Sequence, residues 1–78
     1  MNLEIISPEK TVYSGTAESI TLPGLINGTF TILDRHAPII SALTKGVILY
    51  SVNGKKIEVT TNGGFVEAKN NNVSVCIE

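Results

Sequence analysis

The stretch that decides the fold is VILYSVNGKKIEVTT, residues 47–61. Two runs rich in β-branched residues flank the pair Asn53-Gly54, and such a pair tolerates the positive φ angles that a type I′ turn requires. The stretch therefore predicts a tight hairpin with strands over residues 47–52 and 55–61.

The hairpin is followed by two further turn signals, at residues 62–64 and 70–72, which lead into residues 65–68 and 73–77. In the last segment Val73, Val75 and Ile77 share one face and leave Ser74 and Cys76 on the other. Residues 47–77 are accordingly predicted to form a four-strand meander.

Three short segments precede the hairpin and also read as strands. Residues 3–7 are stopped by Pro8, and residues 16–22 alternate until Pro23-Gly24. Residues 28–33 alternate again, so the glycine-bearing connection at residues 24–28, Asn27 included, reads as a turn. A phosphate-binding loop would need a helix after it, whereas a strand is predicted here.

A polar segment at residues 34–38 ends in Pro38 and is predicted to be an exposed loop. Residues 39–43 follow it and fit either a short strand or one helical turn, because periodicity does not decide over so few residues.

The composition agrees with an all-β chain. Ile, Val and Thr supply 25 of the 78 residues, which suits pleated, half-buried surfaces. About eight to ten short strands separated by Gly, Pro and Asn turns are typical of a sandwich or a barrel. A chain of this length builds one core, so residues 1–78 are predicted to be a single domain.

Charge excludes several partner classes. The formal net charge is −1 and charged residues make up 17% of the chain, so there is no basic surface for nucleic acid or anionic lipid. A surface with so few charges is expected to be covered in part by other proteins. The chain has neither an apolar run long enough to span a membrane nor a signal peptide, which predicts a cytoplasmic protein without direct lipid insertion.

The sequence offers little for catalysis. His36 is the only histidine and Cys76 the only cysteine. A zinc site usually needs three or four ligands, and a Cys-His dyad would need an accessible thiol, whereas a thiol in a strand is more often buried and inert. We therefore expect no metal, no cofactor and no enzymatic activity, and a small enzyme centred on His36 is the least favoured reading.

The order of motifs resembles one family, the epsilon subunit of the F-type ATP synthase in its amino-terminal β-sandwich domain. The resemblance covers essentially all 78 residues and rests on LEIISPEK (residues 3–10), VYSG (12–15), LPG (22–24), GTFTIL (28–33), HAPII (36–40), KG (45–46) and GGFVE (63–67).

The resemblance implies a two-sheet antiparallel β-sandwich and a non-catalytic rotor subunit of the central stalk. Such a subunit belongs to a hetero-oligomer, links gamma to the c-ring, couples proton flow to ATP synthesis, and lies peripherally at the cytoplasmic face of the bacterial plasma membrane. The family's carboxyl-terminal helical hairpin is expected to be missing, since the sequence ends at Glu78, and with it the block on ATP hydrolysis and any ATP binding. The alternative is a free-standing β-sandwich that binds an unrelated partner.

The resemblance also implies which residues contact the neighbouring subunits. Polar groups at the c-ring would pair with polar c-ring loops, and such pairs fix the register of the contact more than they add affinity. The predicted c-ring contacts are Thr29, Asp34, Arg35 and His36, and the predicted gamma contacts are Ile39, Ile40 and Ser41. Two alternatives stay open: His36 bonds only its own loop, and the gamma candidates are core residues. Relatives usually have Gly in place of Thr31 and Pro-Gly in place of Asp34-Arg35, so the loop is expected to differ here.

Overall fold

The computed structural model describes residues 1–26 and 28–78, so Asn27, which the sequence places in a turn, lies outside the described residues. Within these ranges the strands are β1 (Asn2–Ile6), β2 (Thr11–Thr16), β3 (Ser19–Gly24), β4 (Gly28–Leu33), β5 (Ile39–Leu43), β6 (Gly46–Val52), β7 (Lys55–Thr61), β8 (Gly64–Lys69) and β9 (Asn72–Ile77). The prediction of an all-β chain with eight to ten short strands is confirmed. Residues 39–43, which fitted a strand or a helical turn, form a strand.

The hairpin predicted from Asn53-Gly54 is confirmed. Both residues have positive φ, 51° and 79°, and Val52 pairs with Lys55 across the turn. A second turn of the same kind joins β8 to β9 through two consecutive asparagines with φ of 52° and 60°. Asparagine tolerates this conformation better than most side chains, so both turns follow from local chemistry.

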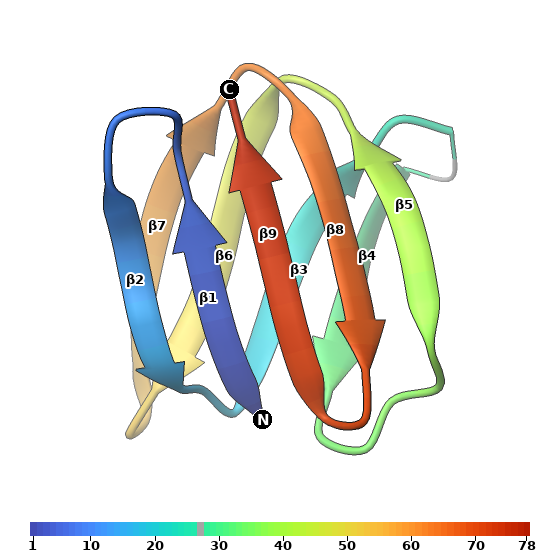
Figure 1. Ribbon diagram of the computed structural model, residues 1–78. Coiled ribbons are helices and arrows are strands. Elements are labelled where there is room, and N and C mark those ends of the chain that lie inside the picture. The colour runs from blue at the N-terminus through green and yellow to red at the C-terminus, as the bar shows by residue number, and fades with distance from the viewer. Residues whose placement is uncertain (27) are drawn as a thin grey trace.

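The strands lie in two layers (Figure 1). The first layer has the order β2-β1-β9-β8-β5 and the second β4-β3-β6-β7. The layers join where Gly24 of β3 pairs with Leu43 of β5, which curls the sheet into a sandwich. One pair departs from the expected antiparallel arrangement, because β1 and β9 run parallel. Alternating side chains look the same in both directions, so the sequence does not encode this pairing.

The predicted four-strand meander is wrong, because β7 and β8 lie in different layers (Figure 1). Thr61 Oγ1 donates to the Gly63 carbonyl at 2.6 Å and accepts from the Gly63 N–H at 3.1 Å, which turns the chain between the layers. Gly64 then has a φ of 141°, and a Cβ there would lie 2.0 Å from the Cys76 carbonyl oxygen. The turn signal at residues 62–64 was correct, but it marks a crossing between layers.

One core fills the space between the layers. The inward faces predicted for β3 and β9 are confirmed, since Ile20, Leu22, Val73, Val75 and Ile77 are all buried. The fully buried side chains that anchor it come from both layers and are Leu3, Ile5, Ile20, Leu22, Ile32, Ile48, Val66 and Val75. Alternation along each strand leaves an outward face on each layer.

The strands run between two ends of the sandwich, at which all the connections gather. We call one the Met1 end; it carries Met1 and the connections at residues 17–18, 34–38, 53–54 and 70–71. We call the other the Leu25 end; it carries Leu25 and Ile26, which follow β3, and the connections at residues 7–10, 44–45 and 62–63. The two ends and the two outward faces are the surfaces available to partners.

Candidate protein-protein interface

The predicted c-ring contacts do not lie together. Thr29 lies at the start of β4, at the Leu25 end, whereas Asp34, Arg35 and His36 follow the other end of the same strand. At a rise of about 3.3 Å per residue, five residues separate Thr29 from Asp34 by about 17 Å. The four residues therefore lie at two ends of one extended strand, and their contact with a c-ring stays a prediction.

Asp34 is bonded within the chain. Its Oδ1 accepts a hydrogen bond of 2.5 Å from the Met1 amino group, which also donates to the Ala17 carbonyl at 3.0 Å. This bond and the positive charge of the amine lower the pKa of the Asp34 carboxyl, although the side chain is 63% exposed. The carboxylate thus fastens the start of the chain to the loop after β4.

The rest of this loop is also bonded internally. Arg35 adopts a φ of 60°, and its N–H donates to Asn71 Oδ1 at 2.9 Å. The His36 N–H donates to the Leu33 carbonyl at 3.2 Å, and His36 Nδ1 lies 2.8 Å from the Ala37 carbonyl oxygen. The loop is exposed, as predicted. The alternative reading of His36, in which it bonds only its own loop, fits this geometry.

The Leu25 end carries uncovered apolar side chains. Leu25 is 58% exposed and Ile26 is 88% exposed. The Leu25 N–H donates to the Ala42 carbonyl at 2.9 Å, which fixes the turn while both side chains project into solvent. Thr29 is exposed close by. Two adjacent apolar side chains at the tip of a fixed turn form a surface that a partner would cover.

The predicted gamma contacts lie on opposite faces of β5, because consecutive side chains of a strand alternate. Ile39 is partly buried against the core and Ser41 is half-buried on the same side, whereas Ile40 points outward and is 75% exposed. The alternative reading, that these residues belong to the core, fits Ile39. Ile40 is left as the candidate for a contact with another chain.

Ile40 belongs to a patterned outward face on the first layer. The cross-strand registers place its outward side chains in three rows. We call them the apolar row (Ala42, Phe65, Cys76, Ile6), the acidic row (Ile40, Glu67, Ser74, Glu4, Ser14) and the amide row (Lys69, Asn72, Asn2, Thr16). Sequence reasoning missed this face. The available signal was Phe65, which is 50% exposed and falls on the polar side of the alternation with Glu67 and Lys69.

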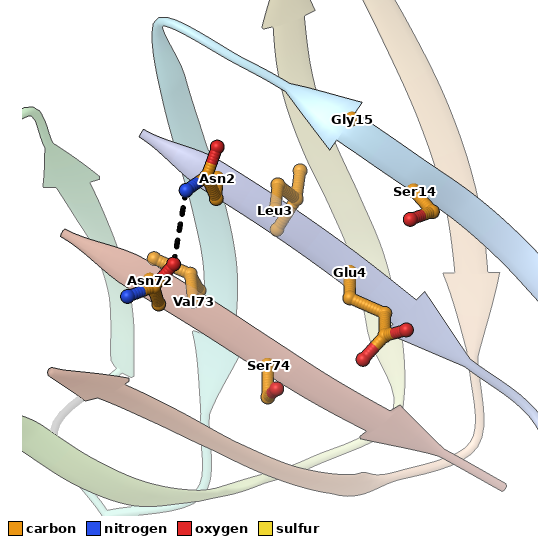
Figure 2. Close-up of a pocket in the computed structure, with 8 residues that line it drawn as sticks. All are labelled: Asn2, Leu3, Glu4, Ser14, Gly15, Asn72, Val73 and Ser74. Carbon is orange, nitrogen blue, oxygen red and sulfur yellow. Dashed lines mark hydrogen bonds between the residues drawn. The ribbon is translucent and has the colours of Figure 1, made fainter.

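A shallow hollow of about 310 Å³ surrounds Glu4 on this face. Figure 2 shows the Glu4 side chain between Ser14 on β2 and Ser74 on β9, with the Asn2 amide donating to Asn72 Oδ1 at 3.0 Å further along the strands. Neither Glu4 nor Glu67 has an ion-pair or hydrogen-bond partner among residues 1–26 and 28–78. The face therefore holds two free carboxylates next to apolar side chains.

The described residues bring no catalytic group together. Cys76 lies near the Leu25 end and His36 at the Met1 end, so they form no dyad. Cys76 is half-buried on the outward face, opposite Val75 and Ile77, which is the side on which the alternation placed it. No three His, Cys, Asp or Glu residues gather as metal ligands in the part of the chain that the structure describes. Nor do the described residues form a helix of the length and hydropathy needed to cross a bilayer.

The chain is a small β-sandwich with an apolar tip at one end and an apolar and acidic outward face on one layer, and it belongs to the class of all-β sandwich domains. Comparison with known families gives the identity more closely. The family model described as "ATP synthase, Delta/Epsilon chain, beta-sandwich domain" matches residues 1–78, and the chain belongs to this family.

Curated relatives agree with the family match. The chain is 48% identical over 73 residues to the ATP synthase epsilon chain of Desulfitobacterium hafniense, covering 94% of this chain and 54% of that one. It is 40% identical over 78 residues to the epsilon chain of Nitratidesulfovibrio vulgaris, covering 100% of this chain and 58% of that one. The chain thus spans just over half the length of these relatives.

Solved structures share the fold at low identity. A chain in the Euglena gracilis mitochondrial ATP synthase, solved as OSCP/F1/c-ring, matches with a TM-score of 0.89 and 19% identity over 96% of this chain and 48% of that one. A chain in the central stalk/c-ring structure of the Tetrahymena thermophila enzyme matches with a TM-score of 0.82 and 16% identity, over 99% of this chain and 62% of that one. At identities this low, the similarity shows that the fold is shared.

Proposed function

We propose that this chain acts as a non-catalytic central-stalk subunit of an F-type ATP synthase, an epsilon chain that links gamma to the c-ring and couples proton flow to ATP synthesis. The full-length family match to the delta/epsilon β-sandwich carries the proposal. Two uncovered surfaces, the Leu25 end and the outward face of the first layer, support it, since a linking subunit needs two contacts.

The c-ring contact is assigned to the Leu25 end with Thr29. The Asp34 and His36 side chains and the Arg35 backbone N–H already bond within the chain at the opposite end, whereas Leu25 and Ile26 are uncovered. Covering two aliphatic side chains contributes favourable free energy that a bonded polar loop does not.

The gamma contact is assigned to the outward face around Ile40, which leaves Ile39 and Ser41 as supports beneath it. Through these two contacts the subunit would be held peripherally at the membrane. For a bacterial enzyme, the side would be the cytoplasmic face of the plasma membrane.

Purification from membranes in mild detergent tests the function. A tagged full-length chain is expected to bring gamma and c with it, and recovery of the chain alone would contradict the proposal.

Single cysteines in a Cys76→Ser background test the two assignments. A bifunctional crosslinker is expected to join Thr29→Cys to c and Ile40→Cys to gamma. Asn53→Cys, at the Met1 end, and Glu58→Cys, on the second layer, are the matched controls and are expected to join neither. Crosslinking of c through Asn53→Cys in place of Thr29→Cys would reverse the assignment of the ends.

A further inference from the structure

The outward face of the first layer forms a trough along β9. The side chains that β9 presents outward are small or short, Ser74 and Cys76 among them. The neighbouring strands present longer ones at the same levels, Phe65 and Glu67 on β8 and Glu4 on β1. With strands about 4.8 Å apart, the backbones of β8 and β1 lie about 10 Å from each other on either side of β9.

An α-helix is the element that fits such a trough. Its diameter with side chains is about 10 to 12 Å, close to the width of three neighbouring strands, so a helix can lie along β9 with one row of side chains in the trough and its flanks over β8 and β1. The backbone groups of β8, β9 and β1 are paired on both sides, so an extended segment would find no ladder to join. A helix satisfies its own backbone and needs only side-chain contacts on this face.

The side chains of the trough specify the chemistry of that helix. At one level lie Phe65, Cys76 and the half-buried Ile6, which require an apolar stripe. Two residues further along each strand, about 7 Å away, the free carboxylates of Glu67 and Glu4 lie on opposite walls.

The hollow around Glu4 is shaped for a cationic side chain. Its volume is about 310 Å³, and the Ser14 and Ser74 hydroxyls flank the carboxylate (Figure 2). An ammonium or guanidinium group there would have one charged acceptor and two hydroxyl acceptors within the same hollow. Lys69 is the cation of the amide row. It is not among the residues that line the Glu4 hollow, and within the described residues it forms no ion pair with Glu4 or Glu67.

We propose that this trough binds an amphipathic helix of a partner subunit, with an apolar stripe over Phe65 and a basic residue on each flank, one for Glu4 and one for Glu67. The inference rests on the proposed function for the identity of the partner, namely the stalk subunit that covers Ile40. The chemistry of the helix follows from the trough itself.

Two synthetic helical peptides test the chemistry. Both carry one leucine stripe, and they differ only in having Lys or Glu at one position on each flank. Added to the ¹⁵N-labelled full chain, the lysine peptide is expected to shift the backbone amides of β8, β9 and β1, and the glutamate peptide to bind about tenfold more weakly. Equal affinity of the two peptides, or shifts on β6 and β7, would overturn the proposal.

Matched variants locate the contacts. Glu4→Gln/Glu67→Gln is expected to weaken the lysine peptide about fivefold, while Glu58→Gln on the second layer leaves its affinity unchanged. Phe65→Ala is expected to weaken it about tenfold, while Leu33→Ala, which is equally exposed on β4, does not. Unchanged affinity in both trough variants would contradict the proposal. So would concentration-dependent shifts of the same amides without peptide, because they would assign the face to a second copy of the chain.

The assembled complex separates this inference from the proposed function. If gamma is recovered with the chain, salt is expected to release the Glu4→Gln/Glu67→Gln variant from the complex at a lower concentration than the Glu58→Gln control. Release of both variants at the same concentration would contradict the helix proposal but not the proposed function. If gamma is not recovered while the lysine peptide still binds the trough, the proposed function fails and the trough chemistry stands.

Discussion

The two ends of the sandwich solve the same problem, turning the chain between strands, with different chemistry. At the Met1 end the connections are polar and bond one another: Asp34 holds the Met1 amine, and Asn71 holds the Arg35 backbone. At the Leu25 end the turn after β3 is held by backbone bonds and leaves Leu25 and Ile26 in solvent. One end is bonded within the chain, and the other leaves two apolar side chains uncovered.

The difference teaches how to read a polar loop. The sequence made residues 34–38 look like the recognition element because they carry Asp, Arg and His together. In the structure the Asp34 carboxylate accepts from the Met1 amine and the Arg35 backbone N–H donates to Asn71, which fastens the loop after β4 to the start of the chain and to the β8-β9 turn. Polar residues that stabilise a connection and polar residues that bind a partner look the same in the sequence. The structure distinguishes them, because it shows which of them already form hydrogen bonds within the chain.

The largest contrast between the ends is expected at their glycines. Gly64→Ala, on the connection at the Leu25 end, should lower the free energy of unfolding by about 4 kcal/mol, because its Cβ would meet the Cys76 carbonyl oxygen and φ is 141°. Gly54→Ala at the Met1 end also has positive φ but open space around it, and should lower it by about 1 kcal/mol. Urea denaturation measures both free energies of unfolding. Equal losses would show that the atoms close to the added Cβ do not determine the cost of the substitution.

The next contrast concerns binding. Leu25→Ser/Ile26→Ser should weaken association with an ATP synthase stripped of this subunit by about 2 kcal/mol, roughly 30-fold, while changing stability by less than about 0.5 kcal/mol. Ala37→Ser, an exposed position at the Met1 end, is the control and should leave both unchanged. Fluorescence titration gives the affinity. If Ala37→Ser lowered the affinity as much as the double variant does, the two ends would not differ in binding.

Much of the fold follows from local signals in the sequence. Alternation located the strands, and Asn53-Gly54 fixed the β6-β7 hairpin, because a type I′ turn is a property of two residues. The parallel β1-β9 pair and the crossing from β7 to β8 depend on contacts between distant parts of the chain. No signal within a few residues could encode them, so the predicted meander failed there.

The candidate interface was predictable only in part. The sequence grouped Ile40 with Ile39 and Ser41, whereas in the structure only Ile40 points outward, because neighbours in a strand point to opposite sides. The carboxylates Glu4 and Glu67 are 63 residues apart in sequence and meet on one face only through β9. Their row becomes visible once the strand order and register are known.

A smaller effect is expected from relieving the backbone at the Met1 end. Arg35 has a φ of 60°, and Arg35→Gly keeps the N–H that Asn71 accepts while removing the Cβ. We expect it to raise the free energy of unfolding by about 0.5 to 1 kcal/mol relative to Arg35→Ala, which retains the strain. Thermal unfolding of the two variants side by side measures this. A glycine variant less stable than the alanine variant would show that chain entropy outweighs strain.

The smallest effect concerns the charge that fastens the Met1 end. The Met1 amine lowers the pKa of Asp34 below its ordinary value of 3.8, so between the two values the folded chain binds fewer protons than the unfolded chain. The stabilisation by Asp34 is thus fully present above about pH 3.8 and is lost as the pH falls through the lower pKa of the folded state. Melting temperatures of the wild type and Asp34→Asn between pH 7 and 2 should converge at the acid end. A gap between wild type and Asp34→Asn that stays constant over the whole range would mean that Asp34 acts through its shape and hydrogen bond alone, and that the Met1 end is held without the help of charge.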